Sequence, residues 1–441
     1  MARKMAFTFK PESIPEAIVY KTLVFTWLFY AFGALYVVGP VLGWTLFALA
    51  VIALYFGPSL RPSLRPAGPV PFIVWLWIAG MLVMLIALWG GHLQWGLGLK
   101  QTIKSSVGWA KGWALLALFP LAGAVLQVRR ESIIRGQCVI GLWTLLLLPV
   151  MFAAPYIGLP ERIFVSPLKA VGGPGPEYFS VYFYTLDPST WTPRWQFYAP
   201  WSPFAGLLGI VMVACALEEK QPFWKTCGIV AGLAIIVLTK SRMSLVGVIV
   251  CTVAPRMLPL VAKVYAWRLA AAFATLMAIF GGAVLTMIQG GIYAFKNARA
   301  DSTRVREALQ RIAYDRWSEA YWFGHGTVQP GPHLVEYMPI GSHHTWYGLL
   351  FVKGLTGFLA MLVPLAMQTL IVVVDCIRHP RGQLPLSIVF VMIVLSFGEN
   401  IEIEAYLLWP ALMMLGIHAR EMWQAENANA RLAQAEETMP A

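Results

Sequence analysis

Two adjacent histidines stand at the start of an apolar run, in the stretch GSHHTWYGLLFVKGLTG that covers residues 341–357. Histidine is the usual general base near neutral pH, and it is also a common metal ligand. No Cys, Asp or Glu clusters with His343 and His344 at the spacing of a metal site, so we expect no metal there. Adjacent residues of a helix point about 100° apart. One histidine can therefore face a pocket as a catalytic base, while the other caps the helix or lies at the membrane interface.

Two arginines precede apolar runs elsewhere in the chain. Arg194 stands between Pro193 and Trp195, just before an apolar run, and Arg242 lies in LTKSRMSLVG, a short polar break between two apolar runs. A charge at that depth is costly, and the following helix offers free N–H groups at its N-terminus. These features predict a phosphate-binding site at Arg242. The alternative for both arginines is a cation that snorkels to lipid headgroups.

A third basic segment, residues 297–326, predicts a helix that begins near Asp301 and runs to about Ser318. Most of its charges have an oppositely charged neighbour three or four positions away, and Arg304 is among these paired residues. Arg306 has no acidic neighbour at those positions, which would leave it available for a ligand. Both arginines stay candidates for binding an anionic group.

The composition is that of a membrane protein. The chain has 441 residues, of which 59% are hydrophobic and 12% charged, and its mean hydropathy is +0.66. Soluble domains carry about 25% charged residues. The five cysteines are scattered through apolar segments, so they predict neither a disulfide framework nor a zinc site. We expect no cofactor and no nucleic-acid partner.

Hydropathy predicts an all-α polytopic protein with about twelve transmembrane helices. The expected spans are 22–38, 41–57, 70–90, 107–127, 138–156, 200–217, 223–238, 242–258, 267–291, 343–374, 384–399 and 403–418. They divide the chain into a cytoplasmic N-terminus (1–21), helices 1–5 (22–156), an aromatic-rich periplasmic loop (157–199), helices 6–9 (200–291), a long periplasmic loop that contains a helix (292–342), helices 10–12 (343–418) and a cytoplasmic tail (419–441).

The basic residues orient these spans. With the N-terminus in the cytoplasm, 18 of the 33 Lys and Arg residues fall on the cytoplasmic side, in short loops and tails. Another 14 lie on the opposite side, and Lys353 lies within a span. Basic residues on the outer face are unusual, and an anionic ligand such as pyrophosphate would explain them. The aromatic residues of loop 157–199 suit either stacking on sugar rings or an interfacial aromatic belt.

Four of these stretches together resemble the bacterial O-antigen ligase and polymerase superfamily, which comprises membrane glycosyltransferases of the GT-C class. They are RWQFYAPWSPFAG (194–206), TKSRMSLVG (239–247), RADSTRVREALQRIAYDRW followed by FGHG (299–326), and HHTWYGLLFVKGLTG (343–357). The likeness covers about residues 20–418. In the family a Gly-x-x-Gly follows the histidine by eleven residues, and counting back from Gly354 selects His343. His344 then replaces the usual Asn, and Lys353 stands where the family often has an acid.

The resemblance implies glycan transfer from undecaprenyl-pyrophosphate to the lipid A-core acceptor of lipopolysaccharide, on the periplasmic face of the bacterial inner membrane. It implies that Arg194, Arg242 and either Arg304 or Arg306 bind the pyrophosphate without a metal, with Arg242 also stabilising the leaving group. His343 or His344 would be the general base of an inverting displacement. The expected partners are these two lipid-linked glycans and the surrounding membrane lipids.

Other functions stay open from the sequence. An O-antigen polymerase would use a second lipid-linked repeat as acceptor, and a protein O-oligosaccharyltransferase would use Ser or Thr. The two long outer loops and the Arg-rich helix favour the ligase, whose acceptor is polyphosphorylated. A transporter, from a different class, would place ionisable groups at the midplane of discontinuous helices. Lys353 is the one strongly charged residue that we expect well inside a span.

Overall fold

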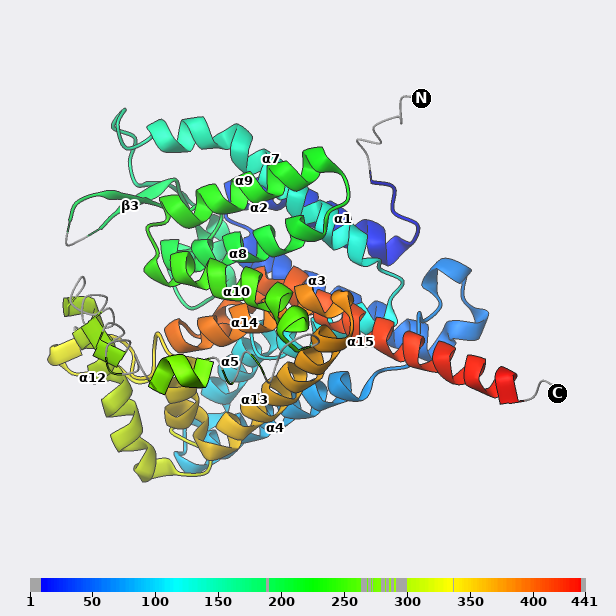
Figure 1. The fold of residues 1–441 in the computed structure, drawn as a ribbon. Helices are drawn as coiled ribbons and strands as arrows, with labels where there is room; N and C mark the ends of the chain where they lie inside the picture. The colour runs from blue at the N-terminus through cyan, green and yellow to red at the C-terminus, as the bar shows by residue number, and fades with distance from the viewer. Residues whose placement is uncertain are drawn as a thin grey trace.

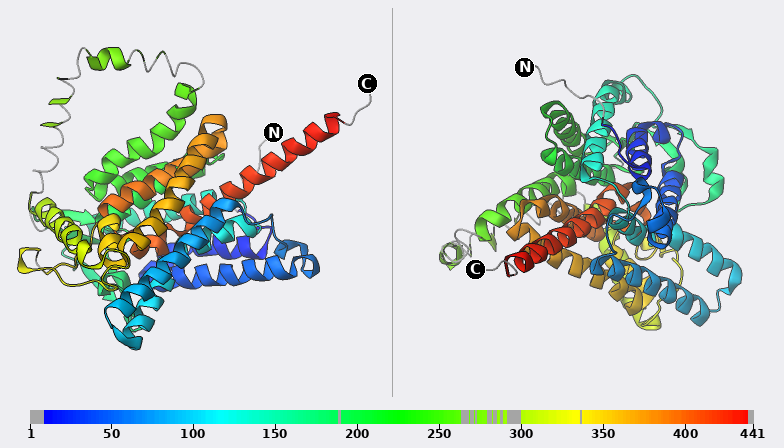
Figure 2. Two further views of the ribbon diagram at one scale, coloured as in Figure 1. Left: turned by 90° about the horizontal axis from the view of Figure 1, so that it is seen from below. Right: turned by 90° about the vertical axis from the view of Figure 1, so that its right-hand side faces the viewer.

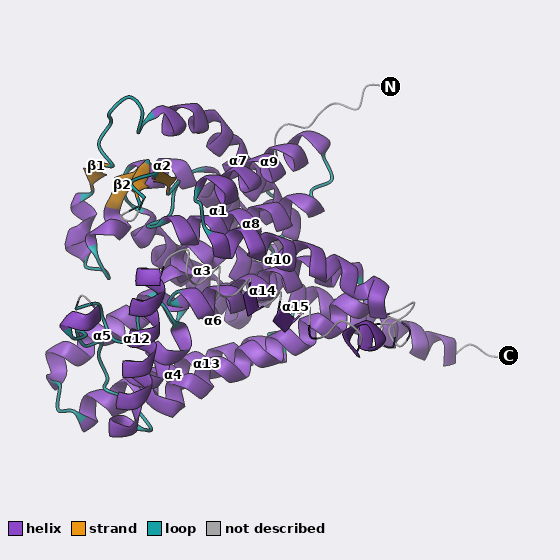
Figure 3. Cartoon of the chain, turned by 60° about the vertical axis from the view of Figure 1, so that its left-hand side comes forward, coloured by secondary structure: helices purple, strands orange, loops and turns teal. Residues whose placement is uncertain are grey.

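The computed structural model describes residues 9–187, 190–262, 300–335 and 337–437, with scattered positions between 263 and 299 (Figure 1). Its helices are α1 (Ile14–Val24), α2 (Thr26–Ala31), α3 (Leu35–Phe56), α4 (Phe72–Gln94), α5 (Gly98–Lys111), α6 (Leu115–Val125), α7 (Arg130–Ala153), α8 (Ser202–Glu218), α9 (Pro222–Leu238), α10 (Arg242–Leu260), α12 (Ala300–Trp317), α13 (Thr345–Arg378), α14 (Gln383–Gly398) and α15 (Ile401–Glu437). Strands β1 (Arg162–Val165), β2 (Ser180–Tyr182), β3 (Tyr184–Leu186) and β4 (Pro193–Trp195) belong to one loop. Helices dominate the described part of the chain (Figure 3).

Eight helices in the described residues are long and apolar enough to cross a membrane. Two more, α8 and α9, are apolar but shorter. An all-α membrane protein is therefore confirmed, whereas the count of twelve spans is not. The expected span 267–291 lies largely outside the described residues.

The boundary between the first two expected spans is wrong. Hydropathy predicts it at 38–41, around Gly39-Pro40, but Pro40 lies inside α3 and the chain turns at Gly33 instead. Gly33 has a φ of 59° and packs against the carbonyl of Phe179, so a side chain would not fit there. The turn is therefore set by a contact with a distant loop, and the preceding apolar residues form two short helices, α1 and α2.

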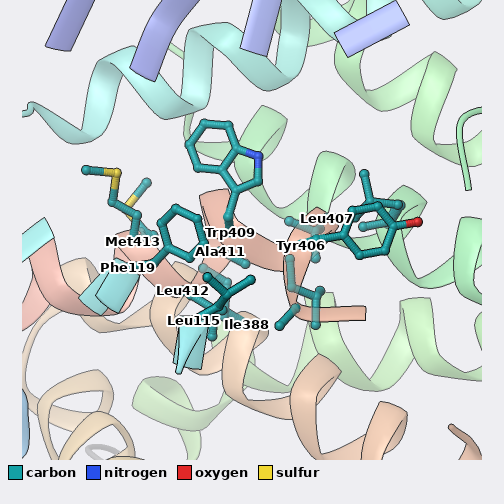
Figure 4. Packing of buried hydrophobic residues seen from close by; sticks show 14 of the residues in the cluster. Leu115, Phe119, Ile388, Tyr406, Leu407, Trp409, Ala411, Leu412 and Met413 are labelled. Atoms are coloured by element: carbon teal, nitrogen blue, oxygen red, sulfur yellow. The ribbon is translucent and has the colours of Figure 1, made fainter. Parts of the chain in front are cut away.

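The centre of the bundle is the contact between α6 and α15. Glycines at this contact allow close approach, because a Cβ on Gly123 would meet the carbonyl of Met413 and one on Gly416 would meet the carbonyl of Pro120. Small residues serve this purpose where membrane helices pack, since lipid supplies no hydrophobic force between them. Phe119 and Trp409 fill the space beside the glycines, with ring centroids 5.8 Å apart (Figure 4). Beyond the bundle, α15 projects toward the C-terminus (Figure 2).

Helix α13 is broken at Gly354, which has a φ of 63° and a ψ of −165°. A break frees backbone groups on both sides, and in lipid these groups must find partners inside the protein. Residues 321–326, here called the strap, supply them. The N–H groups of His325 and Gly326 donate to the carbonyls of Phe351 and Val352, at 2.8 and 3.0 Å. The carbonyls of Tyr321 and Trp322 accept from the N–H groups of Leu355 and Thr356, at 2.9 and 3.1 Å.

The break lies level with the end of α4. Helices α4 and α13 run antiparallel, since Gly80 packs on Ala360 and Gly91 packs on the strap at Phe323 and Gly326. The half-helix Thr345–Lys353 thus lies at or beyond the last turn of α4. In Figure 1 this end of the molecule carries α12 and the β-strands, and both termini lie at the other end. We call the former the site end of the bundle.

Two antiparallel strand pairs, β1–β2 and β3–β4, lie within the loop 157–199, and side chains attach the loop to the helices. The Tyr30 hydroxyl of α2 both donates to the Tyr182 carbonyl at 2.6 Å and accepts from the Tyr182 N–H at 2.8 Å. Trp195 of β4 is buried, stacks on Phe152 and donates to the Met151 carbonyl at 2.8 Å. The described residues of this loop therefore pack against the helices, and Arg194 is held within a short strand.

Candidate functional site

The partly exposed ring of His343 is paired with a buried carboxylate. Its Nδ1 lies 3.1 Å from Oε2 of Glu399, a residue that ends α14 and whose side chain is 3% exposed. His343 itself is 34% exposed and has a φ of 60°, which turns the chain sharply just before α13. A carboxylate can only accept, so the Nδ1 atom carries the hydrogen. In the neutral ring the Nε2 atom is then unprotonated, as a general base requires.

His344 has different surroundings and a different role. It is 7% exposed, it is the N-cap of α13, and its Nδ1 atom accepts from the Tyr347 N–H at 3.5 Å. The rings of Tyr347 and Phe397 pack edge-on against it. Burial lowers the pKa of His344 to about 4, so the ring is neutral at physiological pH. Of the two predicted histidines, His343 is thus the one that reaches solvent with a carboxylate behind it.

Glu399 also joins the histidine to the Arg-rich helix. The Nη2 atom of Arg306 lies 3.7 Å from Oε1 of Glu399, the oxygen that His343 does not contact. The Arg306 side chain is 40% exposed, so part of the guanidinium faces outward. The predicted helix is confirmed as α12, Ala300–Trp317. Arg304 is exposed on α12, and a separation of two residues places it about 200° from Arg306 around the helix.

Arg242 opens α10, whose first turn contacts the residue that precedes Glu399. Ser241 caps this helix by accepting from the Ser244 N–H at 3.3 Å. The sulfur of the next residue, Met243, packs against Gly398, which precedes Glu399 in the chain. The N-terminus of α10, with its free N–H groups and positive dipole, therefore adjoins the end of α14.

Arg194 is bound to the turn that precedes Arg242. Its Nε atom donates to the carbonyl of Thr239 at 3.1 Å, and its Nη1 atom lies 3.6 Å from a carboxylate oxygen of Asp187. Its side chain is largely buried. The three arginine segments and the histidine, which are distant in sequence, thus meet at the end of α14 through a continuous series of contacts.

Glu399 was not predicted from the sequence. The predicted site rests on the basic residues of the outer face, and the acidic stretch Glu399-Asn400-Ile401-Glu402-Ile403-Glu404 lies outside it. Three acidic residues between two apolar runs could have indicated a functional site, as the arginines did. Burying a carboxylate is costly, so its presence there suggests a functional role. The partner of Arg306 was also missed, since only neighbours on its own helix were considered.

Lys353 lies within the candidate span Thr345–Arg378, as expected, and is 6% exposed. It immediately precedes the break at Gly354, which the sequence did not predict, and Gly324 of the strap packs on its backbone. The hydropathy of residues 343–374 hides this break, because glycine is common in apolar runs. Among the described residues, no group of three or more His, Cys, Asp and Glu side chains is arranged to hold a metal ion.

The fold and this cluster define a helical membrane protein that carries a polar, arginine-bearing cluster at the site end of its bundle. No protein-family model matches the sequence, and no curated protein matches it significantly.

Proposed function

We propose that the protein is an O-antigen ligase, which transfers a glycan from undecaprenyl-pyrophosphate to lipid A-core oligosaccharide. The observation that carries this proposal is the double engagement of Glu399, with His343 on one oxygen and Arg306 on the other. A group-transfer site of this kind needs a base for the acceptor and cations for an anionic leaving group. The cluster offers both within reach of one carboxylate.

In the proposed reaction, Nε2 of His343 removes the proton from an acceptor hydroxyl while its oxygen bonds to the anomeric carbon of the donor. The bond from that carbon to the pyrophosphate oxygen breaks, and undecaprenyl pyrophosphate leaves with the electron pair. A single displacement of this kind inverts the anomeric carbon. Glu399 stabilises the imidazolium that forms, as the carboxylate of a catalytic triad does.

The leaving pyrophosphate is neutralised by arginines in place of a metal ion. Arg242 meets it together with the N–H groups of α10, and Arg306 or Arg304 approaches from α12. The sequence resemblance also assigns Arg194 to the arginines that bind the pyrophosphate. Its contacts with Thr239 and Asp187 support an additional role, which is to hold the turn that carries Arg242.

The proposed orientation places the site end in the periplasm. Basic residues of short connections lie at the other end, where Arg135 forms a bidentate pair with Glu219 at 2.9 Å and Arg420 donates to the carbonyls of Leu126 and Val128. Positive charge at that end is the pattern of a cytoplasmic face. Donor and acceptor lipids would reach the site from the outer leaflet of the inner membrane.

An acceptor assay tests the proposal against the polymerase and the protein oligosaccharyltransferase. Purified protein receives a lipid-linked glycan donor with lipid A-core, with excess donor alone, or with a Ser/Thr-containing acceptor protein. We expect glycan on lipid A-core, with a single addition event per acceptor and no effect of EDTA. Longer donor-linked chains without modified lipid A-core would overturn the ligase assignment, and inhibition by EDTA would overturn the metal-independent mechanism.

A further inference from the structure

A cavity of about 300 Å³ adjoins the His343–Glu399 pair. Two of its lining residues are chain neighbours of that pair, because Ser342 precedes the histidine and Asn400 follows the glutamate. Both outer loops contribute to its wall, through Pro174 and Ile340. The cavity therefore lies where the loops close over the site end of the bundle.

Two buried polar atoms of the cavity lining lack a partner in the described part of the protein. The Ser342 hydroxyl and Oε2 of Glu402 are both buried there without a hydrogen bond. Lys353 lines the same cavity and attracts Glu402 electrostatically. A buried polar group without a hydrogen bond is costly, so such groups gathered at one cavity point to a ligand that bonds them.

The chemistry of the lining selects the class of ligand. An ammonium, a carboxylate, a hydroxyl and an amide offer donors and acceptors in balanced numbers, and their formal charges cancel. The remaining wall is apolar and includes the indole of the buried Trp113. A lipid chain would leave Lys353 and Glu402 without hydrogen-bond partners, and a phosphate would add negative charge to a lining whose formal charges already cancel. A neutral sugar ring suits both parts, since it carries adjacent hydroxyls and an apolar C–H face.

The position of the cavity selects the acceptor over the donor. Its lining contains no arginine among the described residues, so the cations proposed for the pyrophosphate lie elsewhere in the site. Its wall includes Ser342, the residue that precedes His343, and His343 is the proposed base that must meet the attacking hydroxyl. Small-molecule sites span roughly 300–1,000 Å³, and a cavity at the lower limit suits a single sugar residue.

We propose that this cavity is the acceptor subsite and binds one neutral sugar residue of the acceptor glycan. Hydroxyls of that sugar bond to Ser342, Lys353 and Glu402, its C–H face lies on Trp113, and the hydroxyl that attacks points to Nε2 of His343. This inference rests on the proposed function, because it assigns one of the two substrates of the same reaction.

Steady-state kinetics with the full-length protein test the assignment. The substrates are a lipid-linked glycan donor and lipid A-core purified from a strain without O antigen. We expect Ser342→Ala and Glu402→Gln to raise KM for lipid A-core by about threefold to tenfold, the effect of one lost hydrogen bond. KM for the donor should change by less than about twofold. Ser342→Ala removes a hydroxyl that has no partner among the described residues, so its folding should be unaffected and its result is decisive.

The matched control is Ser387→Ala. Its buried hydroxyl donates to the Gln383 carbonyl at 3.0 Å inside α14, away from the cavity, and its loss should leave both KM values unchanged. An unchanged KM for lipid A-core in Ser342→Ala would overturn the acceptor subsite, and so would a rise confined to the donor KM.

A binding measurement separates this inference from the proposed function. Fluorescent lipid A-core is titrated, without donor, into the His343→Gln protein with and without Ser342→Ala. Weaker binding after Ser342→Ala upholds the subsite even if the wild-type protein transfers no glycan to lipid A-core, in which case only the ligase assignment fails. Equal binding in the two proteins overturns the subsite.

Discussion

The Nδ1 atom of His343 lies 3.1 Å from Oε2 of Glu399, although 56 positions separate the two residues in the chain. The carboxylate is buried and the imidazole is partly exposed, so the pair has one face toward the protein and one toward solvent. A base held by a buried carboxylate keeps one tautomer and one orientation. This relationship leads to the first prediction.

Glu399→Gln should reduce kcat by about a hundredfold or more, and His343→Gln should reduce it by about 10²–10⁴-fold, the usual contribution of a general base. The amide that replaces the Glu399 carboxylate can donate to Nδ1, which would favour the tautomer with the proton on Nε2. Single-turnover rates of glycan transfer measure the effect. Glu307→Gln, on the exposed surface of α12, is the control and should keep wild-type activity. Retention of more than half the activity by Glu399→Gln would remove the pair from the mechanism.

The two arginines of α12 should differ in their contribution to turnover. Arg306 meets Glu399 and lies at the cluster, whereas Arg304 is exposed about 200° away around the helix. We expect Arg306→Gln to lower kcat by about tenfold to a hundredfold, somewhat less than loss of a fully buried oxyanion donor. Arg304→Gln should change kcat by less than about twofold. Initial rates at saturating donor compare the two variants, and a larger loss in Arg304→Gln would reverse the assignment.

The sequence was informative where local pattern decides structure. Long apolar runs predicted the helices, and the polar break at Thr239–Arg242 predicted the start of α10. The charge pattern after residue 300 predicted α12, and the i,i+4 pair of Arg311 with Asp315 is present at 3.8 Å. These features depend on residues within a few positions of one another, which is the range over which helical periodicity and capping act.

The features that the sequence did not reveal depend on contacts between distant segments. Glu399 gains its meaning from His343 and Arg306, and the break in α13 depends on the strap that bonds to its free backbone groups. Gly33 turns the chain because a loop carbonyl packs against it. An apolar run that contains glycine looks the same whether or not a second segment interrupts it, so hydropathy alone did not reveal the break beside Lys353.

His344 should make the stability of the protein depend on pH. Its folded pKa is about 4, below the value of about 6.5 expected in the unfolded chain. Between pH 4 and pH 6.5 the unfolded chain binds more protons at His344 than the folded protein does. The contribution of His344 to the free energy of unfolding is therefore complete above about pH 6.5 and is lost as the pH falls toward 4. From pH 7 to pH 5 the loss should approach 2 kcal/mol at most, about 1.36 kcal/mol for each pH unit below 6.5.

Thermal unfolding in detergent between pH 5 and pH 7.5 measures this dependence. The comparison variant is His344→Asn, since Asn can accept at an N-cap and does not titrate. It should keep transfer activity and show a flatter pH dependence of its unfolding temperature. The same acid-induced loss of stability in His344→Asn and in the wild-type protein would assign that loss to other groups.

Gly354→Ala should destabilise the site end through the break in α13. An alanine there would hold an unfavourable φ near 63°, and its Cβ would overlap the backbone of Trp322 in the strap. Gly96 is the matched control, because it has a φ of 57° but nothing within 4 Å of a Cβ. Gly96→Ala should therefore lower the free energy of unfolding by about 1 kcal/mol from backbone strain alone, and Gly354→Ala should lower it distinctly more.

Hydrogen exchange should locate the additional loss of stability in Gly354→Ala at the amides of His325, Gly326, Leu355 and Thr356, which bridge the strap and the two halves of α13. Equal destabilisation by the two substitutions, with unchanged protection of these four amides, would show that the strap adapts and that the break does not depend on close packing at Gly354.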